Sequence, residues 1–145
     1  MADNPPSPGP LVVKPNDLEW KNHPALPAGA RFTVVLGDSS KPGVFVIRVH
    51  SPPGVRVMPH THPEDRVYTV ISGRFEIGFG NRFESGLLQA VPEGGMVFVP
   101  KRQAHFQFAE ETGYVIQIHG IGPTSTDYLR AEDDPRRLPP ERGKP

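Results

Sequence analysis

The chain has 145 residues, of which 36% are hydrophobic and 22% charged, a length that suits one domain with a real core but not two. Its 16 basic residues balance its 16 acidic ones, which argues against nucleic acid as a partner because such binding draws mainly on phosphate neutralisation. It contains no cysteine, so disulfides and thiolate metal sites are excluded and any metal must be held by nitrogen and oxygen.

The two ends of the sequence differ in composition from its centre. Residues 1–10 contain four prolines and no aromatic residue, which predicts a flexible or extended arm. Residues 131–145 are charged and proline-rich and predict a C-terminal tail, which leaves residues 11–130 as the folded domain. No run of about 18 apolar residues occurs, and the N-terminus MADNPPSPGP lacks the charged and apolar regions of a secretory signal. We therefore expect a cytoplasmic location and no membrane partner.

Between these ends, the sequence predicts an all-β fold. Its 15 glycines and 19 prolines favour short strands joined by tight turns over helices. Runs rich in β-branched and aromatic residues recur between turn residues, as is typical of a sandwich or barrel. We expect strands at 32–36, 44–50, 66–71, 74–79, 87–91, 96–99, 104–108 and 114–119. Ser72-Gly73 predicts a hairpin, only 81–88 has some helical character, and the alternation in 74–79 predicts Phe75 and Ile77 in the core.

Three histidines form the most informative pattern of the chain. One residue separates His60 from His62, so on a strand both side chains point to the same face and aim two imidazoles at one point. Pro59 and Pro63 flank the pair and restrict the backbone, which predicts a strand edge or barrel mouth. His105 from a neighbouring strand would supply a third ligand for zinc, iron, copper or nickel. Taken alone, the pattern also fits solvent-exposed loop histidines.

The spacing around these histidines resembles that of the cupin family. The matching residues are Gly54, His60, His62 and Gly73 in the first cupin motif, and Gly94, Pro100 and His105 in the second. The resemblance covers roughly residues 31–120 and implies a double-stranded β-helix, a jelly-roll barrel. The strings HPEDRVYTVISG, HGIGP and DDPRR are also similar to a group of small bacterial cupins. The sequence departs from the family pattern at Arg102, where a glycine is common, and at Ala109, where an asparagine is common.

The departure that bears most on the site is Arg66, which stands where the family usually has a glutamate ligand. In one interpretation Arg66 points inward, and an anionic substrate bridges the metal and the guanidinium. In the other it turns outward and pairs with Glu64 or Asp65, as surface ion pairs commonly do. Glu64 is itself a further candidate for coordination, although Pro63 interrupts the strand parity there.

Strand parity extends the list of candidate site residues. Tyr68 shares the parity of His60 and His62, so it either offers a hydroxyl to the cavity or belongs to the core. Gln107 shares the face of His105 and is predicted near the metal. In 114–119, parity does not decide which of the two faces meets the cavity. Gln117 is a candidate for substrate binding if the face that carries it is the inner one. The substrate-binding candidates are thus Arg66, Tyr68, Gln107 and Gln117, with Arg66 and Tyr68 also candidates for catalysis. His23, His50 and His119 are interpreted as structural or surface residues.

Two functions of different classes fit this site. Three neutral histidines leave the charge of one divalent ion (Fe, Zn, Ni or Cu) uncompensated, which favours an anionic ligand. The first hypothesis is a metal-dependent enzyme, a dioxygenase-like oxidoreductase acting on a small anionic or enolisable molecule, for which the resemblance implies dioxygenases and isomerases as precedents. The alternative is a non-catalytic cupin that binds or senses a small molecule.

The resemblance also implies a homodimer, because cupins are commonly dimeric. Leu11, Val12 and Val13 follow the proline-rich arm and could add a strand to the open sheet edge of a neighbouring copy.

Overall fold

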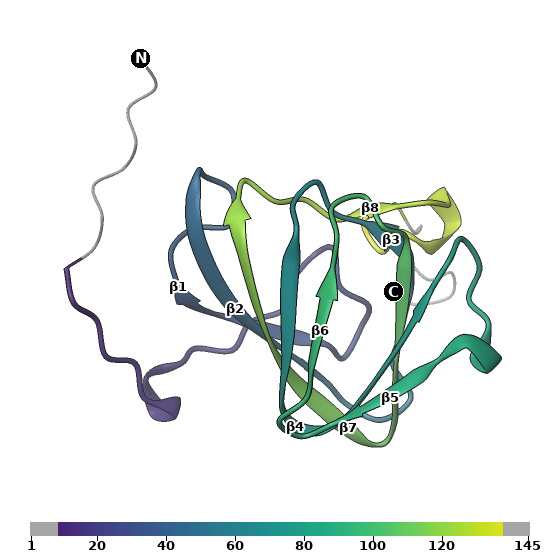
Figure 1. Ribbon diagram of the computed structural model, residues 1–145, viewed down its shortest axis with the longest axis horizontal. Coiled ribbons are helices and arrows are strands. Elements are labelled where there is room, and N and C mark those ends of the chain that lie inside the picture. Colours follow the sequence, from purple (N-terminus) through teal and green to yellow (C-terminus); the bar gives the residue numbers. More distant parts are fainter. Residues whose placement is uncertain (1–8, 138–145) are drawn as a thin grey trace, which may run out of the picture.

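The computed structural model describes residues 9–137, and strands are its main regular elements (Figure 1). The strands are β1 (Arg31–Leu36), β2 (Gly43–Ser51), β3 (Arg56–Thr61), β4 (Arg66–Phe79), β5 (Gln89–Pro92), β6 (Met96–Val99), β7 (His105–Gly122) and β8 (Asp127–Tyr128). Three single 3₁₀ turns complete the elements: η1 (Pro15–Asp17), η2 (Ser85–Leu87) and η3 (Ala131–Asp133). The all-β class predicted from composition and alternation is confirmed.

Two long strands, β4 and β7, organise the barrel. They pair antiparallel along most of their length, and β7 also pairs with β2 and β3, while β4 pairs with β5 and β6. Both strands turn at the bottom of the view in Figure 1, so each contributes to two facing layers. One layer contains β1, β2, β7, β4 and β6, and the other contains β8, β3, β7, β4 and β5. This arrangement is the double-stranded β-helix that the sequence predicted.

The hairpin predicted at Ser72-Gly73 is wrong, because β4 continues through these residues without reversing. Its register against β7 shifts between Val70 and Ser72 and again before Phe75, where the strand bends. Gly73 lies at φ 76°, and a Cβ there would collide with the backbone of Gly113 on β7. Two glycines therefore let the paired strands bend together, and a pattern that reads as a turn is a bent strand.

Two strands, β3 and β8, were not among those expected. β3 pairs with β7 on one side and with β8 on the other, so the His60 segment lies inside a sheet and not at its edge. Its register shifts between Val57 and His60, which is a bulge-like irregularity next to the candidate site. The predicted helical character of 81–88 is limited to the single turn η2.

A hydrophobic core fills the space between the two layers. Phe45, Phe75 and Ile77 are almost completely buried there, and the prediction for Phe75 and Ile77 is confirmed. Aromatic rings pack edge to face within the core, with the Phe75 and Tyr114 centroids 4.9 Å apart. The core thus supports the strands that carry the candidate site.

The segments outside the barrel are only partly described. Lys21 forms a bridge with Phe32, and Trp20 packs its ring edge against His50. After η3, the Asp134 carboxylate is buried and binds Arg136, whose Nη2 also donates to the carbonyl of Thr126. Most of the predicted arm (1–8) and the rest of the predicted tail (138–145) lie outside the described residues. No helix within 9–137 is long and apolar enough to cross a membrane.

Candidate metal centre

The three histidines predicted as ligands come together on two neighbouring strands. His60 on β3 pairs directly with His105 at the start of β7, and directly opposed residues of an antiparallel pair place their side chains on the same face. His62 follows the end of β3 and returns to that face because it lies two residues after His60. The ligand atoms of the three rings all lie within 4.8 Å of one another. They can therefore bind a single ion.

Each imidazole is fixed by one hydrogen bond from Nδ1 to a backbone carbonyl. The distances are 2.7 Å from His60 to Met58 O, 2.8 Å from His62 to Ser125 O, and 2.9 Å from His105 to Gln103 O. A carbonyl only accepts, so each neutral ring carries its proton on Nδ1 and leaves Nε2 as the acceptor atom. Orientation of metal-binding histidines by a carbonyl on the second nitrogen is typical of metal sites.

Burial keeps the three rings neutral. The exposed fractions of His60, His62 and His105 are 2%, 5% and 0%. Burial is the main cause that lowers the pKa of His60 and of His62 well below the ordinary value, and the neighbouring imidazoles and Arg66 add to the effect. Burial likewise lowers the pKa of His105 to about 4. At neutral pH the rings are uncharged, which is the form that binds a metal.

The residues present fit a divalent ion that prefers nitrogen ligands. Among the described residues, His62 Nε2 is buried and has no hydrogen-bond partner. A buried polar atom without a partner costs free energy, and a metal ion would satisfy this one. His105 Nε2 has a different partner, the Tyr68 hydroxyl at 3.1 Å, which donates to it because Nδ1 carries the ring proton.

Tyr68 belongs to a chain of buried hydrogen bonds beside the histidines. Gln107 Nε2 donates to the Tyr68 hydroxyl at 3.3 Å, and the Tyr114 hydroxyl donates to Gln107 Oε1 at 3.3 Å. Burial raises the pKa of Tyr68, so its hydroxyl stays protonated at neutral pH. The predictions that Tyr68 and Gln107 lie near the histidines are consistent with this geometry.

Arg66 combines parts of both interpretations made from the sequence. Its side chain is only 5% exposed and lines the same cavity as the histidines, so it points inward. It nevertheless pairs with Glu64, with Nη2 at 2.7 Å and Nε at 3.0 Å from Glu64 Oε2. Thr124 accepts from Arg66 and donates to the other carboxylate oxygen of Glu64. Both oxygens of Glu64 are therefore occupied, and Glu64 is not grouped with the three histidines as a ligand.

A cavity of about 330 Å³ adjoins the histidines and is lined on one side by Arg66, Tyr68 and Gln107. The structure does not bring Gln117 to this cavity. Gln117 lies on the outer face of β7, where it accepts from Arg48 Nε at 2.9 Å and contacts His119 Nε2 at 2.9 Å. The apolar residues of the 114–119 segment, Ile116 among them, occupy the inner face because burial of apolar side chains decides the orientation of the strand.

Several cavity residues were not found from the sequence. His23 was interpreted as a loop residue, but it lines the cavity, with its ring 4.7 Å from that of Phe32. The segment 124–126, Tyr128 and Arg136 also line it. Arg136 lies in the DDPRR string, and 124–126 directly follows HGIGP, so the resemblance of these strings was the only signal available. Irregular segments carry no periodic pattern from which their position could be predicted.

The comparisons with known proteins agree with the barrel. A family model described as "ChrR Cupin-like domain" matches residues 8–121. No curated protein matches the chain significantly. Among solved structures, the polyketide cyclase RemF from Streptomyces resistomycificus is 14% identical with a TM-score of 0.71, covering 87% of this chain and 89% of its own. KdgF from Halomonas sp. is 19% identical with a TM-score of 0.62, covering 79% and 96%.

A third similar structure contains a metal. Oxalate decarboxylase from Bacillus subtilis, described with Mn(II) centres, is 18% identical with a TM-score of 0.60. The match covers 79% of this chain and 31% of that enzyme. At these identities the similarity establishes the fold.

Proposed function

The chain belongs to the family of ChrR cupin-like domains, and from this premise we propose that it is a metal-dependent enzyme with one divalent ion held by His60, His62 and His105. The observation that carries the proposal is the common orientation of the three rings. Each is fixed at Nδ1 by a carbonyl, and each presents Nε2 within a cluster of ligand atoms no more than 4.8 Å apart.

We propose a dioxygenase-like reaction on a small anionic or enolisable molecule. A bound Fe, Zn, Ni or Cu ion would supply Lewis-acid chemistry and, for iron or copper, redox chemistry. The three histidines contribute no negative charge, and Arg66 with Glu64 forms a neutral pair. The attraction for an anion or an enolate therefore resides at the ion, and not at Arg66 as one interpretation of the sequence supposed.

The chain's own residues would orient such a substrate. The Tyr68 hydroxyl is a neutral donor next to His105 and accepts from Gln107; with an ion on His105 Nε2 its proton would be free to donate to a substrate oxygen bound beside the histidines. Glu64 is engaged by Arg66 and Thr124, so it is poorly placed to take a proton. This favours a substrate with an acidic C–H bond, such as a β-dicarbonyl compound, whose deprotonation needs no strong base.

The engagement of Glu64 also favours the second candidate function, a cupin that binds or senses a small molecule without converting it. The same cavity and histidines serve both functions. The two differ in whether a bound β-dicarbonyl compound is consumed together with oxygen.

Metal analysis tests the first step of the proposal. Protein purified without an affinity tag is expected to retain about one equivalent of a transition metal, and His105→Ala is expected to lose at least tenfold in metal affinity. His119→Ala is the matched control, because His119 is exposed and lies outside the cluster. His105→Gln, with circular dichroism, separates loss of metal from loss of fold. Undiminished metal content in both His105 variants would contradict the three-histidine site.

Oxygen uptake tests the second step. The metal-loaded protein is expected to consume oxygen with pentane-2,4-dione or an aromatic acid, and His105→Ala is not. Binding without consumption would favour the sensing function.

The cellular setting remains part of the proposal. We propose a small molecule as partner, a cytoplasmic location and a homodimeric state.

A further inference from the structure

One wall of the cavity is a continuous apolar surface built from three strands. Two rows of paired residues cross it. In the first row Phe32 of β1 pairs with Val49 of β2, which pairs with Ile116 of β7. In the second, Ile47 of β2 pairs with Ile118 of β7. All five side chains line the cavity, and directly paired residues on one face are close neighbours.

The apolar wall leads directly to the histidines. Ile118 pairs on its other side with Tyr68 of β4, whose hydroxyl lies 3.1 Å from His105 Nε2. A molecule with polar atoms at the histidines therefore has an apolar surface beside it that begins at the Tyr68 ring. The neutral Arg66–Glu64 pair lies at the histidine end as well, and the strand residues of this wall carry no charge, while Arg136 lines the cavity from the segment after β8.

A segment from outside the barrel covers part of this cavity. Ala25 and Leu26 line it, and Ala25 is buried although it precedes every strand. The Tyr128 hydroxyl donates to the carbonyl of Ala25, which joins this segment to β8 beside His60. The apolar part of the cavity is thus bounded by strands and by a tied loop, and it is a fixed feature of the fold.

We propose that the ligand of this site carries an apolar tail of several carbons, which lies along Phe32, Ile47, Val49, Ile116 and Ile118 while its polar head binds at the histidines. The inference rests on the proposed function for the head and adds the tail. A volume of about 330 Å³ is larger than a head group of two or three carbons fills. A cavity that is polar at the histidines and apolar along this wall favours a ligand with a polar head and an apolar tail.

A chain-length series tests the proposal. Binding of pentane-2,4-dione, heptane-2,4-dione and nonane-2,4-dione would be measured by calorimetry on the full-length protein. These probes share one head and differ only in the tail. Affinity is expected to rise about fourfold for each added methylene, the factor that corresponds to roughly 0.8 kcal/mol, until the wall ends. Equal affinities across the series would overturn the proposal.

Two variants on adjacent positions of β2 locate the tail. Ile47→Ser places a hydroxyl in the wall and is expected to lower the affinity for nonane-2,4-dione about tenfold, with pentane-2,4-dione changed less than twofold. Val46→Ser is the matched control, because Val46 lies on the outer face opposite His119, and neither affinity should change. A thermal melt of each variant confirms folding. An Ile47→Ser effect equal for all three probes would contradict the assigned position.

The outcomes separate this inference from the proposed function. The gain in affinity per methylene compares ligands that share one head. It is therefore expected to persist in metal-free protein, even where the head binds weakly. If the diketones show the length dependence but are never consumed with oxygen, the enzyme proposal fails and the tail site stands. If they are consumed with no dependence of binding on length, the tail site alone fails.

Discussion

Arg66 and Glu64 form a buried ion pair in which each charge depends on the other. Both side chains are less than a tenth exposed, and Thr124 completes the hydrogen bonds of the carboxylate. A pair of this kind contributes little net stability compared with an apolar replacement, but loss of one partner leaves an uncompensated charge in a nonaqueous site. The pair therefore matters more for the neutrality of the cavity wall than for the stability of the barrel.

A double-mutant cycle tests this view. We expect Glu64→Leu and Arg66→Met each to lower the free energy of unfolding by about 3 kcal/mol, and the double variant Glu64→Leu/Arg66→Met to lie within about 1 kcal/mol of wild type. Urea denaturation measures all four. Additive losses would show that the two residues act independently.

The buried histidines make the metal-free protein sensitive to acid. The pKa of His105 is about 4 in the folded state against 6.5 ordinarily, so between these values the unfolded state binds more protons and stability falls as pH falls. Between pH 6.5 and pH 4, His105 alone is expected to remove about 1.4 kcal/mol per pH unit. His60 and His62 act in the same direction.

Urea denaturation of chelator-treated protein at a series of pH values would measure this slope. His105→Gln carries no titrating group at that position, so its slope should be smaller by about one proton. A slope equal to that of wild type would show that His105 is not buried in its neutral form.

At the scale of elements, the sequence predicted the other strands but missed β3 and β8, and it placed the joins poorly. Alternation identified both halves of β4 and of β7, but turn residues within them suggested breaks where the strands only bend. The sequence also placed His60 and His62 on one face, which the pairing with His105 completes. Strand parity shows which residues share a face but not which face points inward. It could therefore not exclude Gln117 from the substrate-binding candidates. The loop residues around the cavity depend on tertiary contacts alone.

The bend in β4 gives a prediction at this scale. Gly73→Ala is expected to lower the free energy of unfolding by about 3 kcal/mol or more, because it combines a positive φ with a collision against the Gly113 backbone. Gly86→Ala is the control, since a Cβ on Gly86 meets no atom within 4 Å. Thermal and urea unfolding of both variants provide the comparison. Similar stabilities would argue that the bend does not need glycine.

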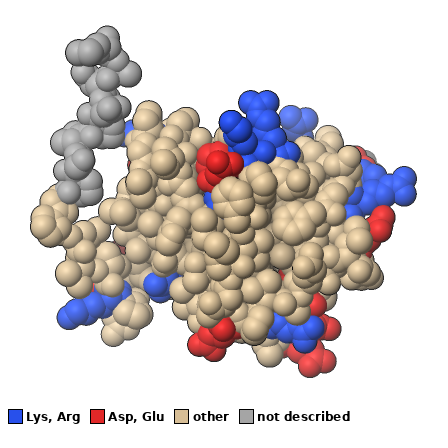
Figure 2. All heavy atoms as spheres, viewed as in Figure 1, with Lys and Arg blue, Asp and Glu red and all other residues tan. Residues whose placement is uncertain are grey.

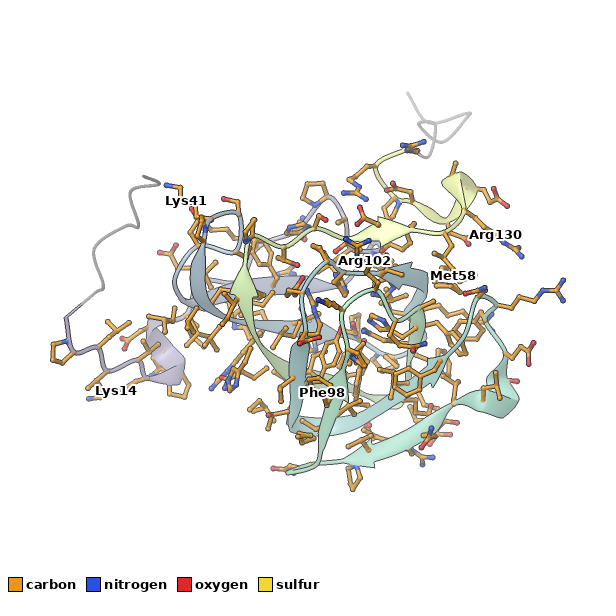
Figure 3. The ribbon with its side chains drawn as sticks, turned by 45° about the horizontal axis from the view of Figure 1, so that its top comes forward. Lys14, Lys41, Met58, Phe98, Arg102 and Arg130 are labelled. Atoms are coloured by element: carbon orange, nitrogen blue, oxygen red, sulfur yellow. The ribbon has the colours of Figure 1, made fainter. Side chains whose placement is uncertain are left out.

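At the scale of the whole molecule, the described surface carries apolar groups that a single copy leaves exposed. Leu11 and Val12 are 58% and 81% exposed, and Met96 and Phe98 of β6 are also exposed. Figure 2 shows charged residues of both signs around the margins of one face and a broad uncharged region in its middle. Phe98, labelled in Figure 3, is 51% exposed. Exposed apolar side chains become part of an interface where they gather into a contiguous patch.

The homodimer remains a prediction, and these exposed apolar groups indicate which residues would form its interface. Light scattering at micromolar concentration is expected to give the mass of two chains, and Leu11→Ser/Val12→Ser is expected to shift the equilibrium toward the monomer if the arm adds a strand to a neighbour. Leu129→Ser, which changes an exposed leucine elsewhere, should leave the mass unchanged. A monomer in the wild type would refute the prediction.

The segment between β7 and β8 also determines when the site can form during synthesis. The ring of His62 is held by Ser125, 63 residues later, while His60 and His105 are held by carbonyls only two residues away. The neighbouring carbonyl of Thr126 accepts from Arg136 at 2.7 Å. A nascent chain that has emerged only as far as β7 can orient two of the three imidazoles. The third imidazole is oriented only after the segment that contains Ser125 has packed beside it, so metal loading is expected to be a late step of folding.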